Sequence, residues 1–201
     1  MKPLRPFPFP LNIGTDICRI SRIHAILRSP RRATRFVNRI FSPEEQARKD
    51  ARLQCLERRP LNAFSDEALG SSGMDAGIKL SSEEMNAGTK LSSEEIARRD
   101  PEWWAAASFV AGRFAAKEAA IKAHSHRRLT FHDVVIERRG RNEERLGSGP
   151  PVARIKGGEG DAEDASAMIS ISHDGDYATA VCMAYDPSVG GEDGKDEGVV
   201  R

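Results

Sequence analysis

The stretch Trp103–His124, WWAAASFVAGRFAAKEAAIKAH, decides the fold of this chain. It is rich in Ala, Phe, Lys and Glu, and Gly112 is its only internal breaker, so it predicts the longest helix of the protein. Just before it, Asp100-Pro101-Glu102 combines an N-cap residue, a proline at the first helical position and an acidic first turn. We therefore expect one long helix that ends near His124.

Strand patterns lie on both sides of this helix. At residues 11–20, LNIGTDICRI, alternation puts Leu11, Ile13, Thr15 and Ile17 on one face of a strand, and Asn12, Gly14 and Asp16 on the other. Further strands are predicted for residues 131–139 and 151–156. Residues 167–185 are a predicted hairpin, because Asp174-Gly175 lies between two β-rich runs. The predicted fold class is α+β, with a small antiparallel sheet packed on the long helix.

Helical patterns fill the segment between the first strand and residue 57. Residues 19–41 predict two short basic helices, the second of which begins at Pro30. Ser42-Pro43-Glu44-Glu45 then combines an N-cap serine, a first-position proline and a glutamate three residues after the cap. This signature predicts a helix from Ser42 to about Glu57.

A change of composition marks an insertion at residues 60–100. The sequence MDAGIKLSSEE at 74–84 is repeated nearly unchanged as MNAGTKLSSEE at 85–95. Two copies are too few for a repeat architecture, so we expect a mostly disordered insertion, with a helix capped by SSEE as the alternative. The domain then spans residues 11–186, between an N-terminal extension (1–10) and an acidic, Gly-rich tail (187–201).

Composition restricts the class of protein. No apolar run among the 201 residues approaches the roughly 18–20 that a membrane span needs, and the first ten residues lack the apolar stretch of a signal peptide. The three cysteines are far apart and have no C-x-x-C spacing, which favours a reducing compartment over a disulfide framework or a zinc ribbon. We expect a cytoplasmic protein, with the mitochondrial matrix as the alternative.

The net charge of +1 hides a strong asymmetry. Residues 19–59 contain twelve Lys/Arg and four Asp/Glu, whereas residues 157–201 contain two and eleven. Such an asymmetry suggests a polyanionic partner or an acidic tail. A nucleic-acid-binding module is therefore one candidate, although the basic segment has no zinc-finger spacing, basic zipper or recognised array of stacking aromatics.

Two acidic residues are candidates for chemistry. Asp16 lies near the end of a strand of otherwise core-like sequence, where a carboxylate needs solvent, a partner or a cation, and Gly14 leaves room for a ligand beside it. Glu118 and Lys122 are four residues apart and share a face of the long helix. The simpler alternatives are a helix-capping aspartate and an ordinary surface Glu–Lys pair.

Other polar residues give weaker signals. His173 and Ser172 beside a tight turn are also typical of plain turn chemistry, and Arg113 and Lys117 are also typical of a solvated helix face. No G-x-S-x-G elbow accompanies the serines, so a hydrolase is not indicated. A zinc site is not indicated either, because further ligands at suitable spacing are missing around His124, His126 and His132.

Taken in order, five segments of the chain resemble the holo-acyl-carrier-protein synthase family of 4′-phosphopantetheinyl transferases. These segments are IGTDICRISRI, SPEEQ, FVAGRFAAKEAAIKAH, FHDVVIERR and ISISHDGDYATAVCMA. The resemblance covers about residues 11–59 and 102–184, and its most specific parts are Gly14-Thr15-Asp16 and the helix motif FAAKEAAIK at 114–122. The insertion at 60–100 departs from compact relatives, which have a short connection there.

This resemblance implies a small α+β fold and a homotrimer with active sites between subunits. It implies transfer of the phosphopantetheine arm of coenzyme A to a serine of an apo acyl-carrier protein, with Mg²⁺ and with release of adenosine 3′,5′-bisphosphate. Asp16 and Glu118 match the Mg²⁺ ligands of the family, and Glu118 and Lys122 match its catalytic residues. The implied contacts to coenzyme A are Arg113, Lys117, Ser172 and His173, the last from a neighbouring subunit.

The resemblance leaves alternatives open. The proton of the carrier serine has three candidate acceptors, which are Lys122, Glu118 and a water on the metal, and the carrier serves fatty-acid or polyketide synthesis. An inactive coenzyme-A-binding subunit is disfavoured, because both acids and the lysine are present. Acyl-carrier proteins are typically acidic, so the basic segment 19–59 is the expected docking surface for the carrier rather than for nucleic acid.

Overall fold

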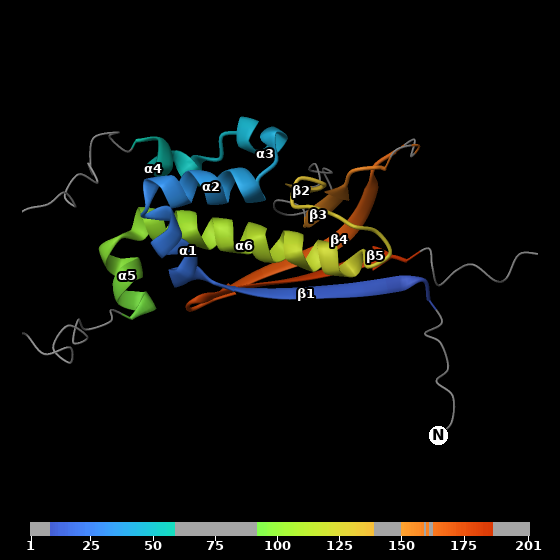
Figure 1. Ribbon diagram of the computed structural model, residues 1–201. Coiled ribbons are helices and arrows are strands. Elements are labelled where there is room, and N and C mark those ends of the chain that lie inside the picture. The colour runs from blue at the N-terminus through green and yellow to red at the C-terminus, as the bar shows by residue number, and fades with distance from the viewer. Residues whose placement is uncertain (1–8, 59–91, 139–149, 159, 161–162, 187–201) are drawn as a thin grey trace, which may run out of the picture.

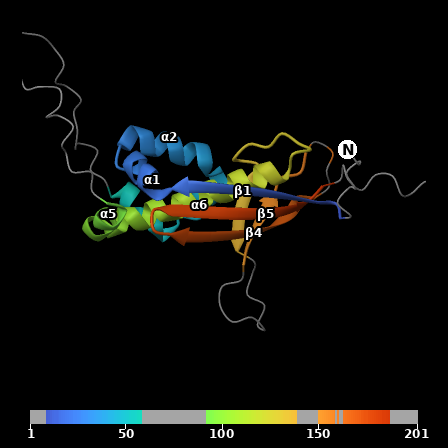
Figure 2. The same cartoon turned by 90° about the horizontal axis from the view of Figure 1, so that it is seen from below.

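The computed structural model describes residues 9–58, 92–138, 150–158, 160 and 163–186. A five-stranded antiparallel sheet and one long helix form the body of this part of the chain (Figure 1). The strands follow the order β1-β5-β4-β3-β2, and α6 lies along one face of the sheet, with β1 below it in Figure 1 and with β1, β5 and β4 in front of it in Figure 2. The predicted α+β fold, a small antiparallel sheet packed on the long helix, is confirmed. None of the described helices is long and apolar enough to cross a membrane.

The helices and strands, in chain order, are β1 (Leu11–Arg19), α1 (Ile20–Leu27), α2 (Pro30–Ile40), α3 (Pro43–Ala47), the 3-10 helix η1 (Ala51–Leu53), α4 (Gln54–Glu57), α5 (Ser93–Arg99), α6 (Pro101–Ala123), β2 (Val134–Arg138), β3 (Pro151–Ile155), β4 (Ala165–Asp174) and β5 (Tyr177–Tyr185). The two short basic helices, with Pro30 at the start of the second, are as predicted. The long helix also has the predicted extent, whereas β2 begins three residues later than expected, after a turn at residues 131–133.

The first strand packs on α6 through its small and polar side. Gly14 is buried, and a Cβ atom at this position would lie only 1.9 Å from the carbonyl oxygen of Ala119, so the backbones of β1 and α6 are in contact. Ile13 and Ile17 point away from the helix and are 59% and 64% exposed. The space beside Gly14 is therefore filled by α6, which corrects the expectation that it leaves room for a ligand.

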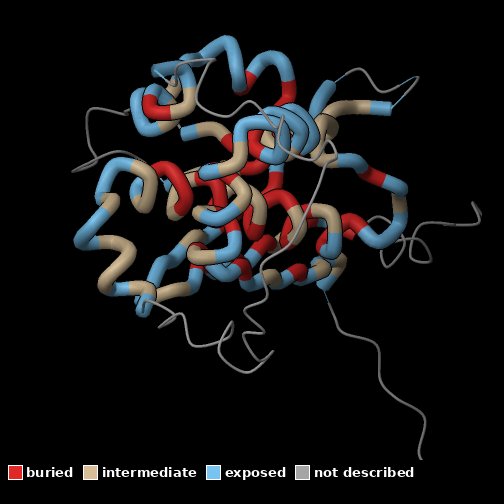
Figure 3. Tube along the Cα trace, turned by 60° about the vertical axis from the view of Figure 1, so that its left-hand side comes forward, coloured by how far each residue is buried: buried red, intermediate tan, exposed pale blue. Residues whose placement is uncertain are grey.

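Small side chains allow this close approach along the whole helix. Buried residues gather in the middle of the fold (Figure 3), and most of those on α6 are alanines. The facing residues of β5 are small as well. On the helix these buried residues include Ala111, Ala115, Ala116, Ala119 and Ala120, and on β5 they are Ala178, Ala180, Cys182 and Ala184. The core therefore holds the two layers together through backbone proximity rather than through bulky side chains.

The opposite face of the sheet is apolar and is covered by no described segment. It carries large side chains from three adjacent strands, β1, β5 and β4, and their exposed fractions run from 41% to 64%. These residues, which we call the outer sheet face, are Leu11, Ile13, Ile17, Met168, Tyr177, Val181 and Tyr185. An exposed apolar patch on adjacent strands is typical of an interaction surface.

A buried lysine connects α6 to three other segments. Lys117 is fully buried, and its ammonium group donates hydrogen bonds to Glu45 Oε2 (2.5 Å) and to the carbonyl oxygens of Ile40 (2.7 Å) and Phe131 (2.9 Å). All three N–H bonds of the ammonium are thus used. Burial lowers the pKa of Lys117, and the Glu45 carboxylate acts in the opposite direction.

The partner of this lysine is equally well connected. Glu45 Oε2 also accepts from the N–H of Ser42 at 3.0 Å, which completes the predicted capping box of α3. Glu45 Oε1 accepts from the N–H of Ile136 at 3.3 Å, on the edge strand β2. The ion pair therefore ties α2, α3 and α6 to the edge of the sheet.

The helix predicted from Ser42 to Glu57 is interrupted. After α3 the chain turns through Lys49, whose φ of 44° lies in the left-handed region and cannot continue a helix. Asp50 then accepts from the N–H of Arg52 at 3.0 Å and caps the new helical turn η1, which leads into α4. A second capping signal inside the segment therefore overrides the helical pattern.

The β4–β5 hairpin turns one residue later than predicted. Asp174 pairs with Tyr177, so the two turn residues are Gly175, with a φ of 51°, and Asp176. The Asp176 carboxylate accepts from the N–H and the hydroxyl of Ser21 at 2.7 and 2.8 Å. The hairpin turn therefore caps the start of α1, a contact between residues far apart in the sequence.

The segment at 60–100 is described only from Ser92 onward. The second SSEE copy forms a capping box, because Ser92 Oγ accepts from the N–H of Glu95 (3.2 Å) and Glu95 Oε2 accepts from the N–H of Ser92 (2.8 Å). For α5 the alternative of a helix capped by SSEE is therefore correct. Residues 59–91, residues 1–8 of the N-terminal extension and the tail from 187 lie outside the described residues.

Asp100 joins α5 to α6 without capping either helix by its side chain. Its carboxylate instead accepts from His24 Nε2 at 3.1 Å and lies 3.4 Å from the Arg28 guanidinium. Asp100 is therefore the N-cap residue of α6, as predicted, and its carbonyl oxygen accepts from the N–H of Trp104 at 2.9 Å. Its carboxylate does not cap the helix, because it contacts two basic groups of the α1 segment instead.

Replacing Lys117 by methionine should lower the free energy of unfolding by about 3–5 kcal/mol, because Glu45 then keeps a buried charge without its main partner. Chemical denaturation followed by circular dichroism measures the change. The matched control is Lys156→Met, which removes a half-exposed lysine that forms no ion pair with another described residue and should cost less than about 1 kcal/mol. Equal losses for the two variants would contradict the role assigned to the buried pair.

Candidate active site

Asp16 and Lys122 meet where β1 lies against the C-terminal half of α6. The Lys122 Nζ atom lies 2.7 Å from Asp16 Oδ1 and 3.0 Å from the carbonyl oxygen of Thr15. The side chain of Asp16 is 15% exposed and that of Lys122 is 50% exposed. The contact follows from the packing of β1, because Asp16 lies on the same strand face as Gly14, which touches α6.

The Asp16 carboxylate has an unsatisfied oxygen. Its Oδ2 atom is buried and has no hydrogen-bond partner among the described residues. A buried carboxylate oxygen without a partner costs free energy unless a donor or a cation reaches it. Glu118 is partly buried and lies one helical turn before Lys122, about 6 Å along the axis, on the same face of α6.

The carboxylates of Asp16 and Glu118 suit a divalent cation that prefers oxygen ligands. No group of three or more His, Cys, Asp or Glu residues that could hold a metal ion occurs in the described part of the chain. Two carboxylates with one free, buried oxygen suit Mg²⁺, which is usually held by one or two protein carboxylates while substrate oxygens and waters complete its shell. They do not suit zinc, which takes more nitrogen and sulfur ligands.

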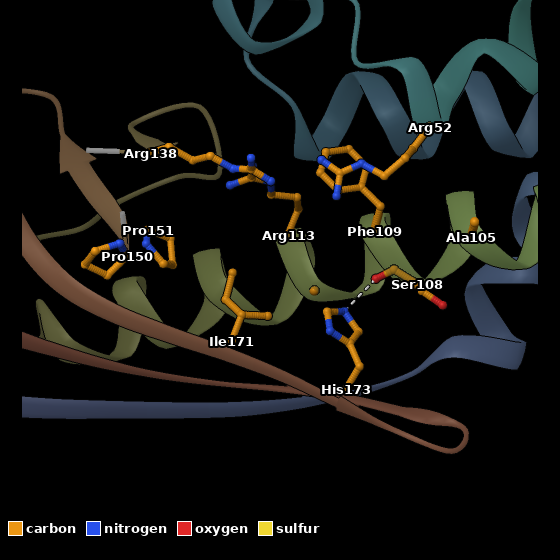
Figure 4. A pocket seen from close by; sticks show the side chains of 11 residues that line it. Arg52, Ala105, Ser108, Phe109, Arg113, Arg138, Pro150, Pro151, Ile171 and His173 are labelled. Carbon is orange, nitrogen blue, oxygen red and sulfur yellow. Dashed lines mark hydrogen bonds between the residues drawn. The ribbon is translucent and has the colours of Figure 1, made fainter. Parts of the chain in front are cut away.

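A second cluster lines a pocket beside the N-terminal half of α6 (Figure 4). The pocket has a volume of about 500 Å³, and three arginines line it, Arg52, Arg113 and Arg138. The Arg52 guanidinium lies 3.8 Å from the centre of the Phe109 ring, and that of Arg113 lies 5.2 Å from it. Arg52 is paired with Asp50, whose Oδ2 lies 2.7 Å from its Nη2 atom, so Arg113 and Arg138 supply most of the positive charge of the pocket. Such a charge beside an aromatic ring is suited to an anionic ligand with a planar group.

His173 forms part of the same pocket from strand β4. Its Nε2 atom lies 3.0 Å from the carbonyl oxygen of Ser108, as Figure 4 shows, so this nitrogen donates the hydrogen bond. A Cβ atom on Gly112 would lie 2.8 Å from the same nitrogen. The missing side chain of Gly112 therefore admits the imidazole ring against the helix.

Arg113 is held in place by the fold rather than by a carboxylate. Its Nη1 atom donates to the carbonyl oxygen of Ile136 at 3.2 Å, and burial lowers the pKa of its guanidinium. Arg52 and Arg138 were not among the predicted site residues. The sequence offered only weak signals for them, since Arg52 is one of many basic residues in segment 19–59 and Arg138 is the first of two arginines after VVIE.

The two clusters are separate within one chain. Asp16 is aligned with Ala180 on β5 and Ala180 with Ile171 on β4, so His173 lies two strands away, roughly 10 Å across the sheet. Along α6, Gly112 and Lys122 are ten residues apart, about 15 Å. The structure thus brings together Asp16 and Lys122, with Glu118 one turn away, and it separately brings together Arg113 and His173.

Two predicted site residues belong to neither cluster. Lys117 is buried and its three N–H bonds are used within the protein, so the prediction that it contacts coenzyme A is wrong. Ser172 is exposed on the opposite face of the sheet from His173, because neighbouring residues of a strand alternate. Its predicted role stays a prediction.

The chain is similar to two curated proteins over most of its length. It is 32% identical over 189 residues to the mitochondrial 4′-phosphopantetheinyl transferase B of Aspergillus fumigatus, which covers 90% of this chain and 97% of that protein. It is 27% identical over 179 residues to the holo-[acyl-carrier-protein] synthase of Anaeromyxobacter dehalogenans, which covers 86% and 94%. No protein-family model matches the chain.

The chain also matches solved structures, at lower sequence identity. The holo-ACP-synthase of Plasmodium yoelii is 20% identical, with a TM-score of 0.47 over 87% of this chain and 94% of that chain. The holo-(acyl-carrier-protein) synthase of Bacillus anthracis, in complex with CoA (3′,5′-ADP), is 23% identical, with a TM-score of 0.42 over 87% and 96%.

The curated relatives are transferases and synthases, and this protein is an enzyme of the same class. More narrowly, the chain belongs to the 4′-phosphopantetheinyl transferase family, because it is 32% identical to the Aspergillus fumigatus transferase over nearly the whole length of both proteins. This confirms the resemblance that Gly14-Thr15-Asp16 and FAAKEAAIK carry in the sequence.

Proposed function

We propose that this enzyme transfers the 4′-phosphopantetheine group from coenzyme A to a serine of an apo acyl-carrier protein. The reaction depends on Mg²⁺ and yields the holo-carrier protein and adenosine 3′,5′-bisphosphate. One observation carries the proposal, the contact of Asp16 with Lys122 one helical turn from Glu118. This contact brings together Gly14-Thr15-Asp16 and the helix motif FAAKEAAIK, the two most specific motifs of the resemblance.

Asp16 and Glu118 are the proposed ligands of Mg²⁺. When bound, the ion polarises the phosphoryl group under attack and stabilises the leaving phosphate. The buried, unpartnered Oδ2 of Asp16 supports this assignment, since an oxygen in that position needs a cation or a donor.

The side chains of the enzyme supply position and charge. The serine oxygen of the carrier attacks the phosphorus that bears the pantetheine arm, and the bond from this phosphorus to the oxygen of the adenosine bisphosphate breaks. In this step the proton of the serine hydroxyl goes to one of the three candidate acceptors, which are Lys122, Glu118 and a water. Lys122, whose side chain is 50% exposed, neutralises negative charge on the phosphoryl oxygens. Catalysis is therefore mainly positioning and electrostatics.

We assign the arginine-lined pocket to the nucleotide end of coenzyme A. Arg113 and His173, both predicted to contact coenzyme A, lie in its wall, and Arg138 adds a further positive charge. Arg52 also lines the pocket, with its guanidinium paired to Asp50. Phosphate groups favour such a cluster, and the ring of Phe109 offers an apolar surface near it. The volume of about 500 Å³ lies in the range of small-molecule sites.

We propose a homotrimer in which each active site combines two subunits. The outer sheet face supports association, because it exposes seven large apolar side chains on three adjacent strands. The separation of the Asp16 cluster from the His173 pocket supports a shared site. In a closed ring of identical subunits, the Asp16 cluster of one subunit lies beside the His173 pocket of the next.

Subunit complementation tests the shared site. Asp16→Asn and His173→Ala each remove one half of it, so each variant alone should have little activity. When the two are co-expressed in equal amounts and assemble at random, each mixed trimer has one site of three with two intact halves. About a quarter of all sites are then intact, so activity should return to about a quarter of the wild-type rate. A mixture that stays as inactive as the single variants would show that each site forms within one chain.

The metal ligand is tested by Glu118→Gln. The rate of phosphopantetheine transfer should fall at least about a hundredfold, because the neutral amide is a much weaker ligand for Mg²⁺. The increase in mass of an apo-carrier protein incubated with coenzyme A and Mg²⁺ measures the rate. Glu94→Gln, an exposed glutamate on α5, is the matched control and should keep the wild-type rate. Near-normal turnover of Glu118→Gln would exclude the ligand role.

Helix α2 presents a basic surface for the carrier. Four of its arginines are exposed, Arg31, Arg32, Arg35 and Arg39. Arg31, Arg35 and Arg39 lie four residues apart on one face of the helix. Of the four arginines, Arg31, Arg32 and Arg35 form no ion pair with another described residue. Exposed arginines on one helix face, two of which form no ion pair with another described residue, support docking of an acidic protein.

Charge reversal on this helix should weaken the carrier but not coenzyme A. The double variant Arg31→Glu/Arg35→Glu should raise the KM for the apo-carrier about tenfold at low salt with little change in kcat, and the difference should shrink as salt is added. Steady-state kinetics with a varied carrier concentration measure both constants. Arg98→Glu, an exposed arginine on α5, is the control. A raised KM for coenzyme A instead would place the defect in the nucleotide pocket.

Three broader assignments follow from the same proposal. The mitochondrial location of the Aspergillus fumigatus relative supports the mitochondrial matrix over the cytoplasm. The proposed substrate is the carrier protein of fatty-acid synthesis. Residues on both sides of the 60–100 insertion share one core, as Cys55 and Ala106 do, which supports a single domain over residues 11–186.

A further inference from the structure

The Asp16–Lys122 pair joins a mostly buried carboxylate to an ammonium group on a half-exposed side chain. Asp16 lies on a strand that is fixed against α6 at Gly14, and its side chain is only 15% exposed. Lys122 reaches it from the helix surface with a side chain that is 50% exposed. A lysine side chain has four flexible bonds and its ammonium group is strongly hydrated, so Lys122 can move away from the carboxylate at a small cost in free energy. Asp16 stays in place, because its strand is packed against α6.

The two oxygens of Asp16 are in different situations. Oδ1 accepts from Lys122 at 2.7 Å, while Oδ2 is buried without a partner. A divalent cation bound to either oxygen therefore lies next to the ammonium group. Like charges at such short range repel strongly, and partial burial reduces the screening by solvent.

We propose that Lys122 competes with the divalent cation for the Asp16 carboxylate. In this exchange the ammonium group leaves Oδ1 when the cation binds, and no covalent bond changes. Lys122 thereby lowers the affinity of the free enzyme for the metal, and once released it is available to an anionic substrate. The proposal rests on the proposed function, since it assumes that Asp16 is a metal ligand.

The competition makes metal and substrate binding cooperative. A polyphosphate substrate binds the released ammonium group and so removes the competitor of the metal. By linkage, the metal in turn raises the affinity for the anion by the same factor. The free enzyme then binds the metal weakly and gains affinity when the phosphorylated substrate is present.

Direct metal binding tests the proposal without turnover. Mn²⁺ serves as the probe, and its dissociation constant for the free enzyme is measured by electron paramagnetic resonance in the absence of coenzyme A. Lys122→Gln should bind Mn²⁺ about tenfold more tightly than the wild type, because the competing charge is gone. Lys122→Arg keeps the positive charge and should stay within about twofold of the wild type. Asp16→Asn shows which part of the binding belongs to this site.

Thermal stability gives a second, independent readout. In EDTA, Lys122→Gln should melt below the wild type, because Asp16 loses its partner while it stays partly buried. Added Mg²⁺ should then raise the melting temperature of Lys122→Gln by more than that of the wild type, since tighter binding stabilises more. Equal increments would overturn the competition.

The outcomes separate this inference from the proposed function. If Asp16→Asn abolishes Mn²⁺ binding but Lys122→Gln binds Mn²⁺ as the wild type does or more weakly, the competition is wrong and the metal site stands. If no Mn²⁺ binding depends on Asp16 in either protein, the competition and the metal assignment are both wrong. Tighter binding by Lys122→Gln and unchanged binding by Lys122→Arg together support the exchange.

Discussion

The buried charge of Lys117 is the constraint on which the rest of the structure depends. An ammonium group removed from water needs acceptors at every N–H, and here they come from the end of α2, the start of α3 and the loop before β2. Their positions fix the rotation of α6 about its axis. At about 100° per residue, Glu118 and Lys122 then fall on a different side of the helix, where β1 brings Asp16.

Two lysines of one motif therefore have opposite environments. Lys117 is enclosed and saturated by fixed acceptors, whereas Lys122 keeps half of its side chain in solvent. In FAAKEAAIK the two lysines have similar surroundings, because each follows a short apolar run. Lys117 directly precedes Glu118, and Lys122 lies one helical turn after it. The sequence could not separate them, because the difference arises from Glu45, which lies 72 residues away in the chain.

Local signals predicted most of the fold. Pro30, Pro101 and the serine caps mark the helix starts in both sequence and structure, because these residues act on their immediate neighbours. Features that depend on distant partners could not be predicted in this way. The apolar side of β1 faces outward because α6 requires the small side at Gly14, and Asp176 caps α1 from another element. Likewise, the motifs predicted the contact of Asp16 with the helix, whereas only the tertiary structure placed Arg52 beside Arg113.

The contact at Gly14 has a consequence for how this enzyme can change over evolutionary time. Main-chain atoms, not side chains, set the separation of β1 and α6, and main-chain atoms are the same in every sequence. Substitutions elsewhere in the core can then accumulate without altering the distance between the carboxylate and the ammonium group. The geometry of the reaction centre is therefore preserved when other core residues change, provided that residue 14 remains glycine.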